Sequence, residues 1–324
     1  MNILISSIGR RVALANCFRQ VLVEINLKGS VIGADLTDIA PAYHVTDRSY
    51  RVCPICDSEY VPQLLNICRN EQISLMFSVL DSDLLKLSQA KQQFTDIGTY
   101  VMISSPEVIS ICRDKFKTHG FFVSAGVPTP RLYRTADFPN EIEFPLYIKP
   151  SNGSASVNSF KVSNWEEYVF FRSYVQDPML LEFIDGGEYT CDIYIDSVGD
   201  VRGIIPRRRL EVRAGEVSKA RIEMNPAVIE PTRKVAKALA ERGATGVLNI
   251  QCILSPEGHA YFIEINPRFG GGCPLSIKAG YNFPKWIIQE TLGQEINTQI
   301  EGDGDGLTML RYDEAVFVNN GKRV

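Results

Sequence analysis

The segment at residues 260–268, AYFIEINPR, limits more than any other what this chain can fold into. β-Branched and aromatic residues alternate there with polar ones, and a proline ends the run, which predicts a short strand. Residues two apart in a strand share a face, so Glu264 and Asn266 point one way while Ile263 and Ile265 point into a core. A carboxylate beside an amide oxygen suits a hard divalent ion that carries phosphates.

A second alternating strand at residues 246–254 precedes it, and the turn-rich residues 255–259 join the two as a hairpin. With a loop at residues 256–259, Ser255 lies opposite Ala260. This register pairs Gln251 with Glu264 and Asn249 with Asn266, so four polar side chains share one face. We interpret the face as a metal site; the alternative is a face that is only solvated.

Composition sets outer limits on the class of protein. A chain of 324 residues suggests two or three domains, and a net charge of −4 gives no broad attraction to nucleic acid or anionic membranes. No apolar run approaches the roughly 20 residues of a membrane span, and the N-terminus reads as a strand rather than a signal peptide. Eight scattered cysteines indicate reduced thiols in a cytoplasmic protein. Cys53 and Cys56 have metal-like spacing, but no second pair complements them, so zinc is not expected.

Residues 1–104 alternate between strands and helices, which predicts a small open parallel α/β sheet. Strands are expected at residues 2–6, 30–34, 75–79 and 100–103, with helices at residues 11–23, 59–69 and 83–94. The first loop has a single glycine and lacks the G-x-G-x-x-G pattern, so a dinucleotide site is not expected. Arg10 and Arg11, with Asp35, form either a site for an anionic or polar ligand or ordinary surface charge.

Phosphate-binding features follow in the next part of the chain. A helix from Ser105 to about Ser124 carries Asp114 and Lys115, and a strand at residues 144–150 ends in Lys149. The small residues 151–156 would let backbone N–H groups approach phosphate oxygens, although plain turns have similar composition. This is not a Walker loop.

Residues 180–189, LLEFIDGGEY, predict a strand, a turn and a second strand. Backbone groups near Phe183 and Ile184 could read an adenine edge, and Glu188 is placed to bind ribose hydroxyls. The alternative is a generic hairpin with surface acids.

The order of these motifs resembles the ATP-grasp superfamily, and most closely its carbamoyl-phosphate-synthase-like branch of carboxylate–amine ligases. The resemblance covers about residues 105–295, and the preceding part is similar to a pre-ATP-grasp domain. It implies an α/β and α+β protein: an N-terminal Rossmann-like open parallel domain at residues 1–104, then a two-lobed ATP-grasp domain at residues 105–318. The small lid lobe would be residues 105–180, and the large lobe with hinge and metal site residues 181–318.

The resemblance also implies roles for individual residues. Gly270–Pro274 departs from the synthase pattern, which is polar and serine-rich there, and this argues against carbamoyl phosphate synthesis. The implied roles are phosphate-binding cations at Lys115 and Lys149; a mobile loop containing Ser151, Gly153, Ser154 and Ser156; an adenine hinge at Glu182, Phe183 and Ile184; a ribose acid at Glu188; metal ligands at Gln251, Glu264 and Asn266; and Arg268 near the transferred phosphoryl group.

A basic cluster remains, with six cations between Arg207 and Arg221. Arginines there would bind a substrate carboxylate or acyl phosphate, and Arg209 and Arg213 are the leading candidates. The alternative is a solvated basic loop.

The expected activity is ATP- and Mg²⁺-dependent ligation of a small carboxylate to an amine through an acyl phosphate. Two Mg²⁺ ions are expected, with Mn²⁺ as a substitute. The alternatives are a small-molecule kinase or synthase-like phosphotransferase, and a nucleotide-binding protein without turnover. No nucleic acid or membrane partner is expected, and a homodimer is left open.

Overall fold

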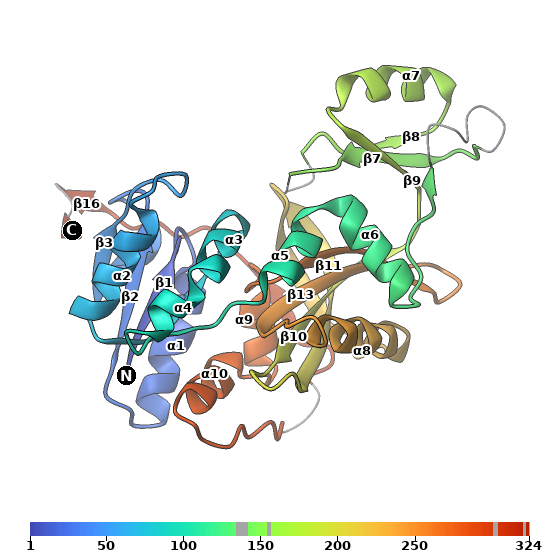
Figure 1. Ribbon diagram of the computed structural model, residues 1–324. Helices are drawn as coiled ribbons and strands as arrows, with labels where there is room; N and C mark the ends of the chain where they lie inside the picture. Colours follow the sequence, from blue (N-terminus) through green and yellow to red (C-terminus); the bar gives the residue numbers. More distant parts are fainter. Residues whose placement is uncertain (134–141, 154–156, 301–303, 320–321, 324) are drawn as a thin grey trace.

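The computed structural model describes residues 1–133, 142–153, 157–300, 304–319 and 322–323. Its described residues form one parallel sheet, two larger antiparallel sheets and a short two-stranded hairpin, so the predicted α/β and α+β class is confirmed (Figure 1). Among the described residues, no helix has both the length and the apolar character needed to span a membrane.

The N-terminal sheet is parallel, with strand order β3-β2-β1-β4-β5. Its edge strand β3 was not predicted, because its short, polar sequence RSYR has no apolar pattern. The predicted helix at residues 83–94 is interrupted at Ala90. The elements are β1 (Asn2–Ser6), α1 (Val12–Glu24), β2 (Ser30–Asp35), a 3-10 turn (Pro41–His44), β3 (Arg48–Arg51), α2 (Tyr60–Asn70), β4 (Ile73–Ser78), α3 (Asp81–Gln89), α4 (Lys91–Thr95) and β5 (Tyr100–Val101).

The helix expected at residues 105–124 is two helices, α5 (Pro106–Arg113) and α6 (Lys115–Ser124). Ser105 caps the first, accepting a hydrogen bond from the Val108 N–H. The chain is extended at Asp114, whose carboxylate accepts hydrogen bonds from the first turn of α6 and so begins a second helix. The break places Lys115 at the first position of α6.

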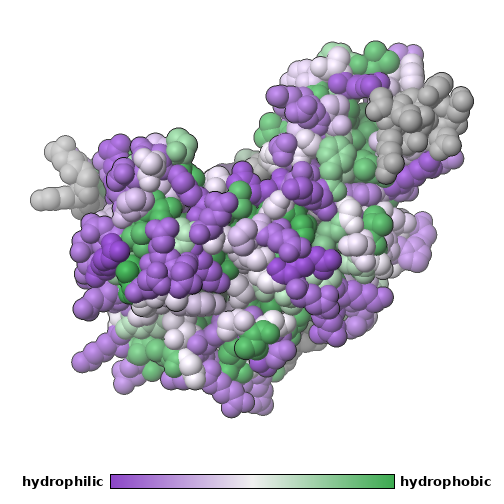
Figure 2. Space-filling model, viewed as in Figure 1, coloured by the Kyte–Doolittle hydropathy of each residue, from purple (hydrophilic) through white to green (hydrophobic). Residues whose placement is uncertain are grey.

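The smaller antiparallel sheet has the order β6-β9-β7-β8 and is covered by α7. Together these elements project from the rest of the molecule (Figure 1, Figure 2). Their bounds are β6 (Leu132–Tyr133), β7 (Leu146–Pro150), β8 (Phe160–Val162), α7 (Trp165–Tyr174) and β9 (Pro178–Glu182).

The larger antiparallel sheet has the order β14-β13-β10-β11-β12-β15 and packs against α8. A small hairpin of β16 (Val318–Asn319) and β17 (Lys322–Arg323) lies near the C-terminus. The other elements are β10 (Gly187–Ile195), β11 (Val201–Arg213), β12 (Glu216–Ile222), α8 (Pro226–Ala240), β13 (Gly246–Leu254), β14 (Ala260–Asn266), α9 (Cys273–Lys278), α10 (Phe283–Thr291) and β15 (Thr308–Leu310).

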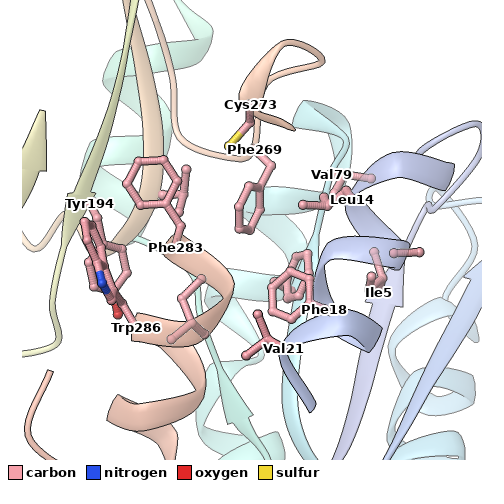
Figure 3. Close-up of a cluster of buried hydrophobic side chains, with 14 of the residues drawn as sticks. Ile5, Leu14, Phe18, Val21, Val79, Tyr194, Phe269, Cys273, Phe283 and Trp286 are labelled. Carbon is pink, nitrogen blue, oxygen red and sulfur yellow. The ribbon is translucent and has the colours of Figure 1, made fainter. Parts of the chain in front are cut away.

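One hydrophobic core joins the parallel sheet to the large antiparallel sheet (Figure 3). The ring of Phe269, just after β14, lies 5.9 Å from that of Phe18 on α1 and 5.3 Å from that of Phe77 on β4. Burial of Phe269 therefore fixes the loop after β14 against the N-terminal sheet. The division at residue 104 stays a prediction.

Candidate active site

A cavity of about 240 Å³ lies between the small sheet and the large one. Its wall combines basic, acidic and apolar side chains from both sheets and from α6. It includes Lys115, Tyr147, Lys149, Gly153, Leu181, Phe183, Ile184, Glu188, Arg209, Gln251, Ile263 and Glu264.

Two lysines predicted to bind phosphate face this first cavity. Lys149 lies near the end of β7, and the pKa of its ammonium is lowered to about 8. Burial is the main cause, Glu264 opposes the shift, and the positive charge of Lys115 adds to it. Burial also lowers the pKa of Lys115, while Glu264 and Asp114 raise it. The Lys115 Nζ donates to the Gly153 carbonyl at 2.9 Å. Two ammonium groups held partly out of water need a partner anion, which phosphates would supply.

Two of the three predicted hinge residues line the first cavity. Phe183 and Ile184 line the first cavity, and Lys161 lies over the Phe183 ring with its Nζ 4.2 Å from the ring centroid. The Glu182 side chain does not line the cavity; its carboxylate accepts a hydrogen bond from the Arg131 N–H. The Glu182 N–H is also occupied, since it donates to the Arg131 carbonyl at 2.9 Å.

The remaining residues predicted to bind nucleotide, where the structure describes them, lie in or beside the same cavity. Glu188 lines it and pairs with Arg209, with 3.0 Å between Oε2 and Nε. Gly153 lines it, whereas Ser151 is buried and fixed by backbone hydrogen bonds to Lys115 and Asp177. Ser154 and Ser156 lie outside the described residues.

A second cavity of about 110 Å³ adjoins the first and is almost entirely polar. Arg209, Gln251 and Glu264 line both cavities, so these residues mark the boundary between them. The wall of the second cavity also includes Arg11, Thr190, Arg207, Glu216, Val217, Asn249, Asn266, Arg268 and Gly270–Gly272.

The hairpin that carries the predicted metal ligands has the expected pairs, Asn249 with Asn266 and Gln251 with Glu264. The predicted loop register is wrong, because Leu254, not Ser255, lies opposite Ala260. A bulge between Gln251 and Cys252 restores the pairing farther along the hairpin.

The bulge also corrects the orientation predicted for Ile263. Cys252 pairs with Phe262, so Ile263 is the extra residue and lines the first cavity instead of packing in a core. Ile265 is buried as predicted.

The oxygen donors on this face fit a divalent ion bound mainly through phosphates. Among the described residues, no group of three or more His, Cys, Asp or Glu side chains could hold a metal by itself. Glu264 is the single carboxylate among the three predicted ligands, beside the amides of Gln251 and Asn266. Magnesium commonly takes one or two protein carboxylates together with substrate phosphates, so this donor set is suitable.

Arg268 is held at the boundary between the two halves of the molecule. Its Nη2 donates to Asp81 Oδ2 at 2.5 Å and to Asn266 Oδ1 at 3.2 Å, while Asn249 Nδ2 donates to its carbonyl. The guanidinium therefore has a defined orientation in the second cavity.

The structure separates the two arginines that sequence reasoning grouped together. Arg209 lines both cavities, whereas the Arg213 side chain is 70% exposed, pairs with Asp313 and lines neither cavity. Arg213 lies at the far end of β11, beside the turn to β12. Closeness in the sequence therefore did not put Arg213 in the same cavity as Arg209.

Arg207 and Arg11 also line the second cavity. The sequence placed Arg207 in the basic cluster without preferring it, and offered Arg11, with Arg10 and Asp35, as either an anion site or surface charge. Arg207 is buried and bonded through two nitrogens to Asp192, at 2.7 and 3.0 Å. Alternation along β11 puts Arg207 and Arg209 on the same face, which was the available signal. Arg11 comes from the N-terminal half; Asp35 does not join it and instead accepts the Gly9 N–H.

Comparisons with known proteins agree with this arrangement. Residues 3–102 match the PylC-like N-terminal domain, and residues 174–310 match the family described as ATP-grasp in the biosynthetic pathway with Ter operon. The D-alanine–D-alanine ligase of Fusobacterium nucleatum is 32% identical over 171 residues, which cover 50% of this chain and 58% of the ligase.

A longer match is to the carbamoyl phosphate synthase large chain of Thermoanaerobacter pseudethanolicus, 25% identical over 303 residues that cover 85% of this chain and 27% of that one. The chain thus spans little more than half of the one relative and about a quarter of the other. The fold is similar to N5-carboxyaminoimidazole synthetase from Staphylococcus aureus complexed with ADP, at a TM-score of 0.74 and 15% identity, covering 93% of this chain and 79% of the synthetase. The solved structure shows that the fold is shared. The family match over residues 174–310, together with the two relatives, identifies an ATP-grasp domain in this chain.

Proposed function

We propose that this chain binds ATP in the first cavity and uses it to join a small carboxylic acid, bound in the second cavity, to an amine. One observation carries the proposal: the two cavities meet at Arg209, Gln251 and Glu264. A phosphoryl group at that boundary would lie within reach of both a nucleotide and an acid. Proximity of this kind is a major source of catalysis in phosphoryl transfer.

The contents of the first cavity suggest how the nucleotide would lie. Its triphosphate would extend toward Lys115 and Lys149, and its adenine would lie beside Phe183 and Ile184. The Ile184 N–H has no backbone hydrogen-bond partner among the described residues, so it is available to a base edge. Glu188 would accept hydrogen bonds from ribose hydroxyls on exchanging its pairing with Arg209.

Gln251, Glu264 and Asn266 would hold Mg²⁺ together with the phosphates, and we include two ions, with Mn²⁺ as a substitute, in the proposal. When bound, the metal would neutralise phosphate charge. Glu264 supplies the full negative charge of the protein part of this site, so its loss should be the most damaging of the three.

In the reaction, a carboxylate oxygen of the acid attacks the γ-phosphorus of ATP, and the bond to the β,γ-bridging oxygen breaks to release ADP. Arg209 and Arg268 are placed to stabilise the charge that develops on the transferred group. The amine then attacks the carbonyl carbon of the acyl phosphate, loses a proton and displaces phosphate. Support for a ligase comes from the relative named D-alanine–D-alanine ligase.

The test is an ADP-release screen over small acids and amines, with hydroxylamine as a trap. An acyl phosphate reacts with hydroxylamine to give a hydroxamate, and product formation should then require both acid and amine. ADP release that needs an acid but gives no hydroxamate, and no response to any amine, would instead indicate a kinase that phosphorylates another group.

A further inference from the structure

We infer that the acid substrate carries a second anionic group, and that Arg11 binds this group at the end of the second cavity farthest from the nucleotide. The inference rests on the proposed function, because it assigns the second cavity to the acid. It concerns a residue from the N-terminal half of the chain.

The two ends of the second cavity differ in what they adjoin. Arg209, Gln251 and Glu264 also line the first cavity, so the reacting carboxylate belongs at their end. Arg11 and Glu216 line the second cavity but not the first. An acid that reaches both ends must present a further group to Arg11.

Charge at the Arg11 end is unbalanced toward positive. Glu216 pairs with Arg10, Arg11 and Arg311, at N–O distances of 3.1, 3.2 and 3.2 Å. Three guanidinium groups thus share one carboxylate. Because its oxygens already have cationic partners, Glu216 orients arginines and is not available to an ammonium group of a substrate. An added anion would relieve the remaining positive charge.

Arg11 also has donor capacity to spare. Its side chain is 17% exposed, and its ion pair with Glu216 uses Nη2, which leaves Nη1 and Nε to a ligand. Burial lowers the pKa of Arg11, Glu216 raises it, and the nearby Arg268 lowers it, with a net downward direction that agrees with incomplete compensation of the Arg11 charge. A bound anion would compensate the charge of Arg11 through charge-assisted hydrogen bonds.

The wall near Arg11 leaves room only because it is made of glycine. A Cβ atom on Gly271 would lie 2.7 Å from Arg11 Nη1, and one on Gly272 would lie 2.2 Å from Arg207 Nη1. Arg207 adds a second guanidinium to this wall, and its Nη1 is buried without a hydrogen-bond partner. The surroundings therefore favour a small anionic group over an apolar side chain.

A carboxylate and a phosphate share this chemistry, and matched pairs of probes distinguish them. Binding of succinate and butyrate, and of phosphoglycolate and glycolate, is measured by calorimetry in the full-length protein with ADP and magnesium present. In wild type, succinate should bind on the order of 30-fold more tightly than butyrate, or phosphoglycolate than glycolate, because the first member of each pair carries a second anionic group. Tighter binding of succinate than of butyrate would identify the substrate as a dicarboxylic acid. Tighter binding of phosphoglycolate than of glycolate would identify it as a phosphorylated acid.

Arg11→Ala should abolish the preference, and Arg11→Lys should restore part of it. The matched control is Arg19→Ala, since Arg19 lies on α1 with its side chain 46% exposed and lines neither cavity. Equal binding within both pairs, or a preference that survives in Arg11→Ala, would overturn the inference. Because binding is measured without turnover, this failure is distinct from failure of the ligase proposal, which would appear as absence of hydroxamate.

Discussion

Asp81 and Arg268 are 187 positions apart in the sequence, yet their side chains meet at 2.5 Å between Oδ2 and Nη2. Asp81 begins α3 in the parallel sheet region, and Arg268 follows β14 of the large antiparallel sheet. Neither side chain is well exposed, at 31% for Asp81 and 15% for Arg268. The N-terminal part of the chain therefore orients an arginine of the candidate active site.

Asp81→Asn should lower kcat and leave the affinity for ATP unchanged, because it loosens Arg268 without touching the first cavity. We expect a loss on the order of 10-fold or more, since one charge-assisted contact is removed. Steady-state kinetics and nucleotide titration would check this. Asp38→Asn is the control, since Asp38 lies in an exposed loop; equal rates in all three proteins would show that Arg268 does not need Asp81.

Glu264→Gln should abolish magnesium-dependent ADP formation while the protein remains folded. The amide keeps the shape of the side chain but removes the one full charge among the predicted metal ligands. The rate should fall by about 10²–10³-fold or more, as for loss of a single electrostatic contact in such sites. Glu257→Gln, in the exposed turn of the same hairpin, is the matched control. Turnover close to wild type in Glu264→Gln would remove the proposed metal site.

Affinity for ATP should fall as the pH rises through about 8, where the buried Lys149 ammonium loses its proton. Bound phosphate favours the charged lysine, so the dissociation constant should rise by up to about tenfold per pH unit above this value. Lys149→Arg should flatten the profile, because arginine stays charged. The exposed Lys234→Arg serves as control and should keep the wild-type slope.

The same lowered pKa has an opposite effect on the empty protein. Unfolded Lys149 retains its proton up to about its ordinary pKa of 10.5, whereas the folded lysine releases it near 8. The unfolded state then binds more protons between these two values, so the contribution of Lys149 to the free energy of unfolding should increase with pH across that window. Unfolding of wild type and Lys149→Met at several pH values would measure it.

Arg209→Ala should cripple ligation and spare ATP binding, whereas Arg213→Ala should leave ligation unchanged. The first side chain lies at the boundary of the two cavities, and its loss should cost roughly 2–4 kcal/mol in transition-state stabilisation. The second is exposed and paired only at the surface, where such pairs contribute at most about 1 kcal/mol to stability. Equal ligation rates in the two variants would contradict the assignment of Arg209.

Gly272→Ala should destabilise the protein and weaken acid binding. The added methyl would lie 2.2 Å from Arg207 Nη1 and 2.8 Å from Val217 Cγ1, and two hydrogen bonds to Asp192 prevent Arg207 from moving aside. Overpacking of this kind typically costs about 1–3 kcal/mol in the free energy of unfolding. Gly120→Ala is the matched control, because no atom lies within 4 Å of the added methyl in α6, and it should stabilise by about 0.5–1 kcal/mol.

Local patterns in the sequence were enough to predict the fold class and most helices and strands, but not the edge strand β3 or the helix breaks at Ala90 and Asp114. Alternation predicted the strands of the metal-site hairpin. The pairing of Gln251 with Glu264 was predicted from a loop register that is one residue off, and the pair is present because the bulge compensates for that error. The order of motifs was enough to recognise the ATP-grasp superfamily. The bulge at Ile263 was beyond local pattern, because an extra residue leaves the alternation on either side intact.

Only the tertiary structure decided which charged residues share a cavity. Arg209 and Arg213 look alike in sequence, but the length of β11 carries one to the boundary of the two cavities and the other to solvent. Arg11 and Asp81 reach the second cavity region from the first hundred residues because burial of Phe269 between Phe18 and Phe77 brings the two sheets together. Contacts across such sequence distances depend on packing of whole elements, and no short-range periodicity encodes them.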